Sequence, residues 1–388
     1  MAVNDLTINQ ISSVLGEIVE QATGSKPMDV IDTSSFVTVA QIGLKTGYDT
    51  LATAISQVLS RTIFSTRPYN RKFGGLEVSN QRYGNHVRKL SPIDKSPEDD
   101  ERYSLIEKGT VDHYKVSKPL VQQTNFYGAN AYQRHLTTYR DQLDMALRSP
   151  DEFGSFVSMM LLNVSDMIEQ DHENTARATV ANLVGGAIDL NGSNVIHCLK
   201  EYNAITAGTY TAETVLNPDT IAGFAKYLVA RINTIAKMLT ERSTEFHQMI
   251  NNKPVKRHTP VANQKAYIFT DYLSKVYANV FSTVFNENYL KIADTEEVNF
   301  WQSIKTPGNI NITPAYTNAT GSVVKGEAVN KPILAVLFDE EAAGYTVVNK
   351  WTQNTPMNAA GGYYNTYWHF TDRYWNDFTE NHVVFVLD

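Results

Sequence analysis

The apolar residues near the N-terminus follow a helical pattern. Between residues 7 and 22 they recur about every three to four positions, the spacing of one helix face. Residues 48–59 repeat this pattern, and a stretch rich in Gly, Ser and Thr joins the two segments. We expect residues 1–60 to form an extended arm that carries short helices rather than a compact domain.

A single long helix is predicted over residues 149–184. Ser149 is a suitable N-cap, Pro150 fits the first helical position, and acidic residues occupy the first turn. Gly185-Gly186 then offers a C-cap. The apolar face of this helix, which predicts packing against a sheet, includes Phe153, Phe156, Met160 and Val164.

The second half of the chain mixes helices and strands. A helix is predicted after the cap at residues 217–219, and a buried strand at residues 265–270 leads into another helix at residues 270–286. Residues 300–330 are rich in turns. Four predicted strands, mostly antiparallel, close the chain: PILAVLF, GYTVVN, YYNTYWHFT and HVVFVL. The fold class is therefore α+β.

Residues 61–118 break the helical pattern and read as a long excursion with short strands, shaped like a two-stranded flap. Its first half is basic and its second half acidic, so its two halves carry opposite charges. The charged residues are Arg67, Arg71, Lys72, Arg82, Arg88 and Lys89, followed by Glu98, Asp99, Asp100 and Glu101. The alternative is a solvated surface loop without a partner. Loops of this length are usually functional or disordered.

Composition and charge exclude several classes of protein. The net charge of −7 argues against a dedicated nucleic-acid binder. A single cysteine, Cys198, excludes a disulfide framework and a Cys-rich zinc site. No secretion signal is visible, and no apolar run approaches the ~18 residues of a membrane span. Charged residues make up only 19% of the chain, which suits broad contact faces.

The search for enzymatic chemistry finds no supported site. There is no phosphate-binding glycine loop and no nucleophile elbow. Glu169, Asp171, His172 and Glu173 could suggest a metal, but no second histidine is suitably spaced, and a solvated helix face is the preferred interpretation. Cys198 is interpreted as a small buried hydrophobe. We expect no catalytic residue, cofactor or metal.

The C-terminal residues 361–388 are unusually aromatic. Strand alternation places Tyr364, Trp368 and Phe370 on one face and Tyr363, Tyr367 and His369 on the other. The rings could form a platform for sugars or bases, a cofactor site, or a strand covered on both sides. The last interpretation is favoured, with the long helix on one side and another segment on the other.

The order of these elements resembles the major capsid proteins of tailed double-stranded DNA bacteriophages, which share the Hong Kong 97 (HK-97) capsid fold. Residues 265–388 are most similar in local pattern to the phi-29-type capsid proteins of short-tailed phages. The segments that carry this similarity are AYIFTDYLSKVYANVF, ILAVLFDEEA, GGYYNTYWHF and ENHVVFVL.

The resemblance implies a division of the chain into named parts. These are an N-terminal arm (1–60), an E-loop (61–118), a P domain (119–200) with its spine helix (149–184) on an antiparallel sheet, an A domain (201–335) and C-terminal strands (336–388) that return to the P-domain sheet. The charged residues of the excursion would then contact neighbouring subunits. Lys72 or Lys89 could also cross-link to Asn365 or Asn376, although phi-29-type shells are not characterised by this chemistry.

The resemblance also implies a function. Many copies would assemble into hexamers and pentamers of an icosahedral or prolate shell around double-stranded DNA, which is held without sequence specificity. A separate scaffolding protein and a portal protein would be partners, assembly would take place in the bacterial cytoplasm, and the product would be the virion. No membrane is involved. The alternative is a carbohydrate-binding surface protein that uses the C-terminal aromatic strands.

Overall fold

The computed structural model describes most of the chain. The described residues are 8–27, 33–47, 49–51, 54, 55, 58, 73–78, 86–104, 106–112, 114–127, 129–217, 219–274 and 294–388. The side chains of residues 157–165 lie outside this description, as does most of the helix predicted at residues 270–286. The predicted core residues Met160 and Val164 therefore lie outside the described side chains.

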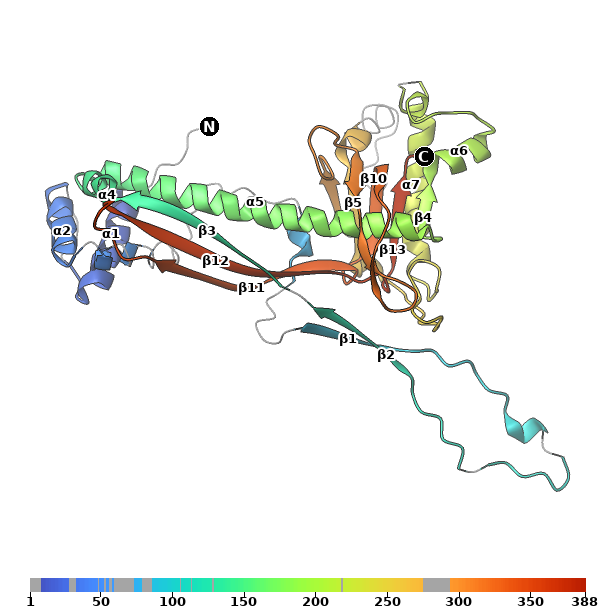
Figure 1. Ribbon diagram of the computed structural model, residues 1–388. Coiled ribbons are helices and arrows are strands. Elements are labelled where there is room, and N and C mark those ends of the chain that lie inside the picture. Colours follow the sequence, from blue (N-terminus) through green and yellow to red (C-terminus); the bar gives the residue numbers. More distant parts are fainter. Residues whose placement is uncertain are drawn as a thin grey trace.

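One long helix, α5 (Pro150–Leu190), forms the axis of the molecule, and the other elements gather at its two ends and along its lower side (Figure 1). Ser149 caps it through a hydrogen bond from the Glu152 amide to the Ser149 hydroxyl (3.2 Å). Its start is as predicted, but the predicted end at Gly185-Gly186 is wrong. The helix continues to a left-handed C-cap at Asn191, because these glycines serve close packing rather than termination.

An antiparallel three-stranded sheet lies along α5. Its strand order is β11 (Ala343–Asn354), β12 (Tyr363–Asn376), β3 (Asn130–Tyr139). Tyr364 and Phe370 of β12 are buried and Trp368 is partly buried, and Phe370 packs with Ile168 of α5. Strand alternation predicts that these three rings share a face, and the structure shows that this face is the one toward α5.

A second, six-stranded sheet surrounds the far end of α5. Its order is β4 (Val195–His197), β13 (His382–Val386), β10 (Val329–Asp339), β5 (Gln264–Phe269) and β6 (Asp294–Val298), and β7 (Asn309–Ile312) pairs with the first part of β10. A small hairpin of β8 (Ala315–Thr317) and β9 (Val323–Lys325) lies apart from it. The four closing strands thus divide between two sheets instead of returning to one.

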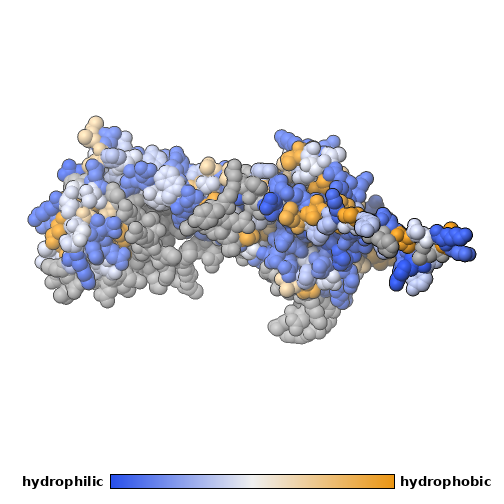
Figure 2. Space-filling model, turned by 90° about the horizontal axis from the view of Figure 1, so that it is seen from below, coloured by the Kyte–Doolittle hydropathy of each residue, from blue (hydrophilic) through white to orange (hydrophobic). Residues whose placement is uncertain are grey.

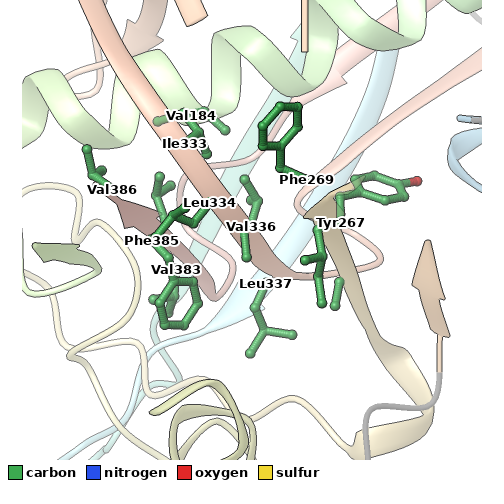
Figure 3. Close-up of a cluster of buried hydrophobic side chains, with 14 of the residues drawn as sticks. Val184, Tyr267, Phe269, Ile333, Leu334, Val336, Leu337, Val383, Phe385 and Val386 are labelled. Atoms are coloured by element: carbon green, nitrogen blue, oxygen red, sulfur yellow. The ribbon is translucent and has the colours of Figure 1, made fainter. Parts of the chain in front are cut away.

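The main hydrophobic core lies within the six-stranded sheet. Figure 3 shows side chains of β5, β10 and β13 converging with Val184 of α5. Residues 333–339 of β10 are all buried, so both faces of this strand are covered. The helices α6 (Cys198–Thr206) and α7 (Ile221–Met238) contribute to the same core.

The N-terminal helices form a second core at the other end of α5. The helices α1 (Ile8–Thr23), α2 (Thr33–Lys45) and α4 (Arg140–Ala146) enclose Leu15 and Phe36, which have no exposed surface. Phe153 and Phe156 at the start of α5 complete this cluster. The expectation of an extended segment is therefore wrong for these residues, because their apolar faces are buried against α4 and α5.

A hairpin of β1 (His86–Pro92) and β2 (Val121–Tyr127) projects away from both sheets (Figure 1). The chain between these strands extends further outward as a long loop. We call residues 86–127 the hairpin arm. It falls largely within the predicted excursion, and its two strands are antiparallel as expected of a flap.

Candidate assembly surfaces

The outer part of the hairpin arm exposes large apolar side chains. Tyr103, Ile106, Tyr114 and Val116 have 87%, 79%, 89% and 77% of their surface exposed. Figure 2 shows hydrophobic and hydrophilic residues side by side along this projection, at the right of the view. Apolar patches on a projecting element are typical of protein contact sites. The arm tip is therefore a candidate surface for binding another chain.

The acidic run of the arm is partly neutralised within the arm itself. Lys115 forms ion pairs with Glu98 (2.8 Å) and Glu101 (3.1 Å), and Arg102 pairs with Asp100 (2.5 Å). The hydrogen bonds from Lys115 and Arg102 lower the pKa values of the Glu98 and Asp100 carboxyls. All of these side chains are exposed, so the pairs contribute little stability. They order the tip more than they hold it to the body.

The basic residues predicted to contact a neighbour have different surroundings. Arg88 is exposed on β1. Lys89, the next residue, points to the body of its own subunit and forms ion pairs with Asp377 (3.0 Å), Glu341 (2.8 Å) and Glu380. The other predicted basic residues, Arg67, Arg71, Lys72 and Arg82, lie outside the described residues.

A row of stacked rings crosses the face of the three-stranded sheet that points away from α5. Trp351 of β11 stacks on His369 of β12, with ring centroids 3.8 Å apart and planes inclined by 11°. Tyr367 lies 6.1 Å from His369 and 5.4 Å from His135 of β3, again nearly parallel. Trp351 remains 45% exposed. We call these four residues the ring row.

The ring row could be predicted only in part. Tyr367 and His369 were assigned to this face by strand alternation. Trp351 and His135 were not identified, because their positions depend on the pairing of β12 with both β11 and β3. In that register Trp351 is opposite His369 and His135 is opposite Tyr367. Cross-strand pairs of this kind are neighbours on one face of a sheet.

The predicted solvated face at residues 169–173 is wrong at two positions. His172 and Glu173 are only 7% and 3% exposed, because this face of α5 packs against the sheet and residues 73–76. His172 lies 3.7 Å from Asp372, and Glu173 pairs with Arg177 (2.7 Å). These contacts make the segment a buried polar junction between helix and sheet.

The remaining chemical candidates lead to no site. Within the described residues, no group of three or more His, Cys, Asp or Glu side chains could hold a metal ion. Cys198 is buried, and burial raises the pKa of its thiol well above the usual range, as is typical of structural cysteines. Among the helices of the described part, none is both long and apolar enough to cross a membrane.

Comparisons with known proteins agree with this architecture. The chain is similar to a capsid structure of Staphylococcus phage Andhra (TM-score 0.54, 11% identity). The match covers 84% of this chain and 87% of the phage Andhra chain. It is also similar to a chain from the structure of the head fiber and inner core protein gp22 of native bacteriophage P68 (TM-score 0.52, 9% identity, 84% and 87% covered). At such low identity these matches show the fold, which is HK-97-like.

The sequence comparison identifies the family. A search of curated proteins finds no match. A family model described as "Phi29-like phage major capsid protein" matches residues 16–386, nearly the whole chain. Proteins of this family form the capsid shell and are components of the virion. The long axial helix, the two sheets, the projecting arm and this match together show that the chain belongs to the Phi29-like phage major capsid proteins.

Proposed function

We propose that the subunit builds the shell by laying its hairpin arm across a neighbouring subunit, over the face of the three-stranded sheet that points away from α5. The observation that carries this proposal is the exposure of Tyr103, Ile106, Tyr114 and Val116 on an element that projects from the body. The arm points away from its own three-stranded sheet in Figure 1. Among the described residues, the arm tip and the three-stranded sheet do not contact each other within one subunit (Figure 1), but the arm of one copy can contact the sheet of another.

The ring row is the receiving surface in this proposal. Its rings are flat and stacked, and such aromatic surfaces pack well against tyrosine and aliphatic side chains. The exposed face of Trp351 gives an anchor of the type that dominates binding energy at interfaces. Charged residues of the arm, with Arg88 and Asp99 exposed, would set register more than affinity.

In the proposed assembly, hexamers and pentamers close a shell around double-stranded DNA. Each contact is repeated over many copies, so modest interfaces give a stable whole through avidity. The net charge of −7 supports a container that does not bind the packaged DNA tightly. A separate scaffolding protein and a portal would take part in the host cytoplasm, and the chain would act structurally rather than as an enzyme.

The test compares variants of the two surfaces. We expect Tyr103→Ser with Tyr114→Ser, and separately Trp351→Ser, to yield folded subunits that fail to form shells in negative-stain microscopy and sedimentation. The stability of the arm variant should change by less than about 1 kcal/mol, because Tyr103 and Tyr114 are largely exposed in the subunit. Trp351→Ser should cost more, because this ring is half-buried and stacks on His369.

Val323→Ser is the matched control, because Val323 is 78% exposed on the separate β8–β9 hairpin. We expect it to form normal shells. Normal shells from both the arm variant and the Trp351 variant would contradict arm docking on the ring row.

A further inference from the structure

The two short turns that connect the sheets meet at the base of the hairpin arm, and the third connection runs through α5. Residues 340–342 join β10 of the six-stranded sheet to β11 of the three-stranded sheet. Residues 377–381 join β12 back to β13. The two turns are bonded to each other, since the Asp377 amide donates to the Ala342 carbonyl (2.7 Å). Any rotation of one sheet against the other must displace these turns.

Lys89 of the arm is held by carboxylates from both turns. Its ammonium group pairs with Glu341 of the first turn (2.8 Å) and with Asp377 (3.0 Å) and Glu380 of the second. Asp377 and Glu380 are almost completely buried. Burial alone would lower the pKa of Lys89, but Asp377 and Glu380 outweigh it, and the pKa lies above its usual value. The side chain therefore stays charged and bound.

Further polar contacts complete the base. Arg257 donates to the Ser91 hydroxyl of β1 (2.8 Å) and pairs with Glu380 (3.1 Å). Asp94 accepts from Arg242 (2.9 Å) and from the Lys256 amide (3.2 Å). Among the arm residues whose side chains are described, Ile93 is the one buried apolar group. Directional charged contacts, rather than an apolar core, thus set the angle at which the arm leaves the body.

We propose that Lys89 is a mechanical coupling residue that ties the direction of the hairpin arm to the relative orientation of the two sheets. Because Lys89 binds both inter-sheet turns, a rotation between the sheets moves the arm, and a displaced arm strains the turns. A neighbour that captures the arm would then bias the shape of the subunit itself. This last step rests on the arm docking proposed above, whereas the coupling within one subunit does not.

The test measures distances within unassembled full-length subunits. Spin labels at Thr110→Cys on the arm and Thr209→Cys on the body measure the distance from the arm to the body. Labels at Gln353→Cys and Thr209→Cys measure the distance between the three-stranded sheet and the part of the body that contains the six-stranded sheet. All three positions are exposed, and the native Cys198 is buried and will resist labelling. We expect Lys89→Gln to broaden both distance distributions in pulsed electron paramagnetic resonance.

Lys331→Gln is the matched control. Lys331 also pairs with a carboxylate, that of Asp388 (2.6 Å), away from the arm, and both distributions should keep their wild-type width. If Lys89→Gln leaves the arm distribution unchanged, the coupling is refuted. A broadened arm with an unchanged sheet-to-sheet distribution also refutes it, because the arm would then be released without affecting the turns.

A second variant guards against misfolding. Lys89→Gln leaves buried carboxylates without their partner, so the variant could unfold. Lys89→Met combined with Glu380→Gln removes one charge of each sign and should fold while broadening both distributions. Narrow distributions in this folded double variant would overturn the proposal. Because assembly is not part of this measurement, its result is independent of the shell-formation test.

Discussion

His382 lies at the start of β13 with no exposed surface, and its ring is fixed by hydrogen bonds on both sides. Nδ1 lies 2.8 Å from the Glu380 carbonyl oxygen, which can only accept, so Nδ1 carries the proton. Nε2 then accepts from the Asn194 side-chain amide (2.8 Å). Burial, reinforced by the neighbouring His247, lowers the pKa of His382 from 6.5 to about 4. The neutral ring is therefore a structural part of the core.

Because the pKa of His382 is lowered in the folded protein, we expect the protein to lose stability in mild acid. The unfolded chain binds the proton below pH 6.5 while the folded chain resists it to about pH 4. The contribution of His382 to the free energy of unfolding is therefore fully present above pH 6.5. It decreases by up to about 3 kcal/mol as the pH drops toward 4. Urea unfolding between pH 7 and 4.5 should show this slope.

The slope should be smaller in His382→Gln, and His258→Gln, at an exposed position, should keep the wild-type slope. Parallel pH profiles for the wild type and His382→Gln would show that His382 does not cause the acid sensitivity.

At the scale of the elements, tertiary packing determines the role of two glycines in α5. A Cβ on Gly185 would lie 2.6 Å from the Ile312 side chain, and one on Gly186 would lie 2.5 Å from the Phe378 ring. Glycine is used here to bring the helix close to its neighbours, although the same pair suggests a helix end by local rules. The helix therefore extends beyond its predicted terminus.

Two glycine-to-alanine changes should consequently have opposite effects. Gly16 lies in α1 with no atom within 4 Å of its would-be Cβ, so Gly16→Ala should stabilise by about 1 kcal/mol through helix propensity. Gly186→Ala gains the same propensity but crowds the buried Phe378 ring, and overpacking costs typically 1–3 kcal/mol.

Thermal unfolding of the two variants measures the difference. We expect the melting temperature to rise for Gly16→Ala and to fall for Gly186→Ala. A rise in both would mean that the Phe378 ring moves aside without cost and that close packing does not explain Gly186.

At the scale of the whole molecule, two separate cores are joined by α5. The N-terminal cluster holds Leu15 and Phe153, and the cluster at the six-stranded sheet holds Leu337 of β10 and Val184 of α5. The clusters share no residue, and they lie toward opposite ends of the helix in Figure 1. Cores without shared contacts can open as separate cooperative units.

Hydrogen exchange should reveal two units of stability. Leu15→Ala removes a fully buried side chain and should destabilise its cluster by about 2–5 kcal/mol. Peptides from α1 and α2 should then exchange faster, while those from β10 and β13 keep their protection. Leu337→Ala should produce the reverse pattern, and a uniform loss of protection in either variant would mean that the molecule unfolds as one unit.

Much of this architecture was predictable from local patterns. The start of α5 was predictable because Ser149 and Pro150 satisfy the needs of a helix N-terminus within one turn. That Tyr364 and Phe370 share one face of β12 followed from strand alternation. Neither requires knowledge of a distant residue.

By itself, the sequence determined the approximate position and type of several main elements, which rings of β12 share a face, and the resemblance to phage capsid proteins. These depend on periodicity and end signals, which act over a few residues. Only the tertiary structure decided that the closing strands divide between two sheets, that α1 and α2 pack with α4 and α5 in one core, and that Lys89 binds both inter-sheet turns. The reason is that these features join residues up to 291 positions apart, and no local preference specifies which distant partner is chosen.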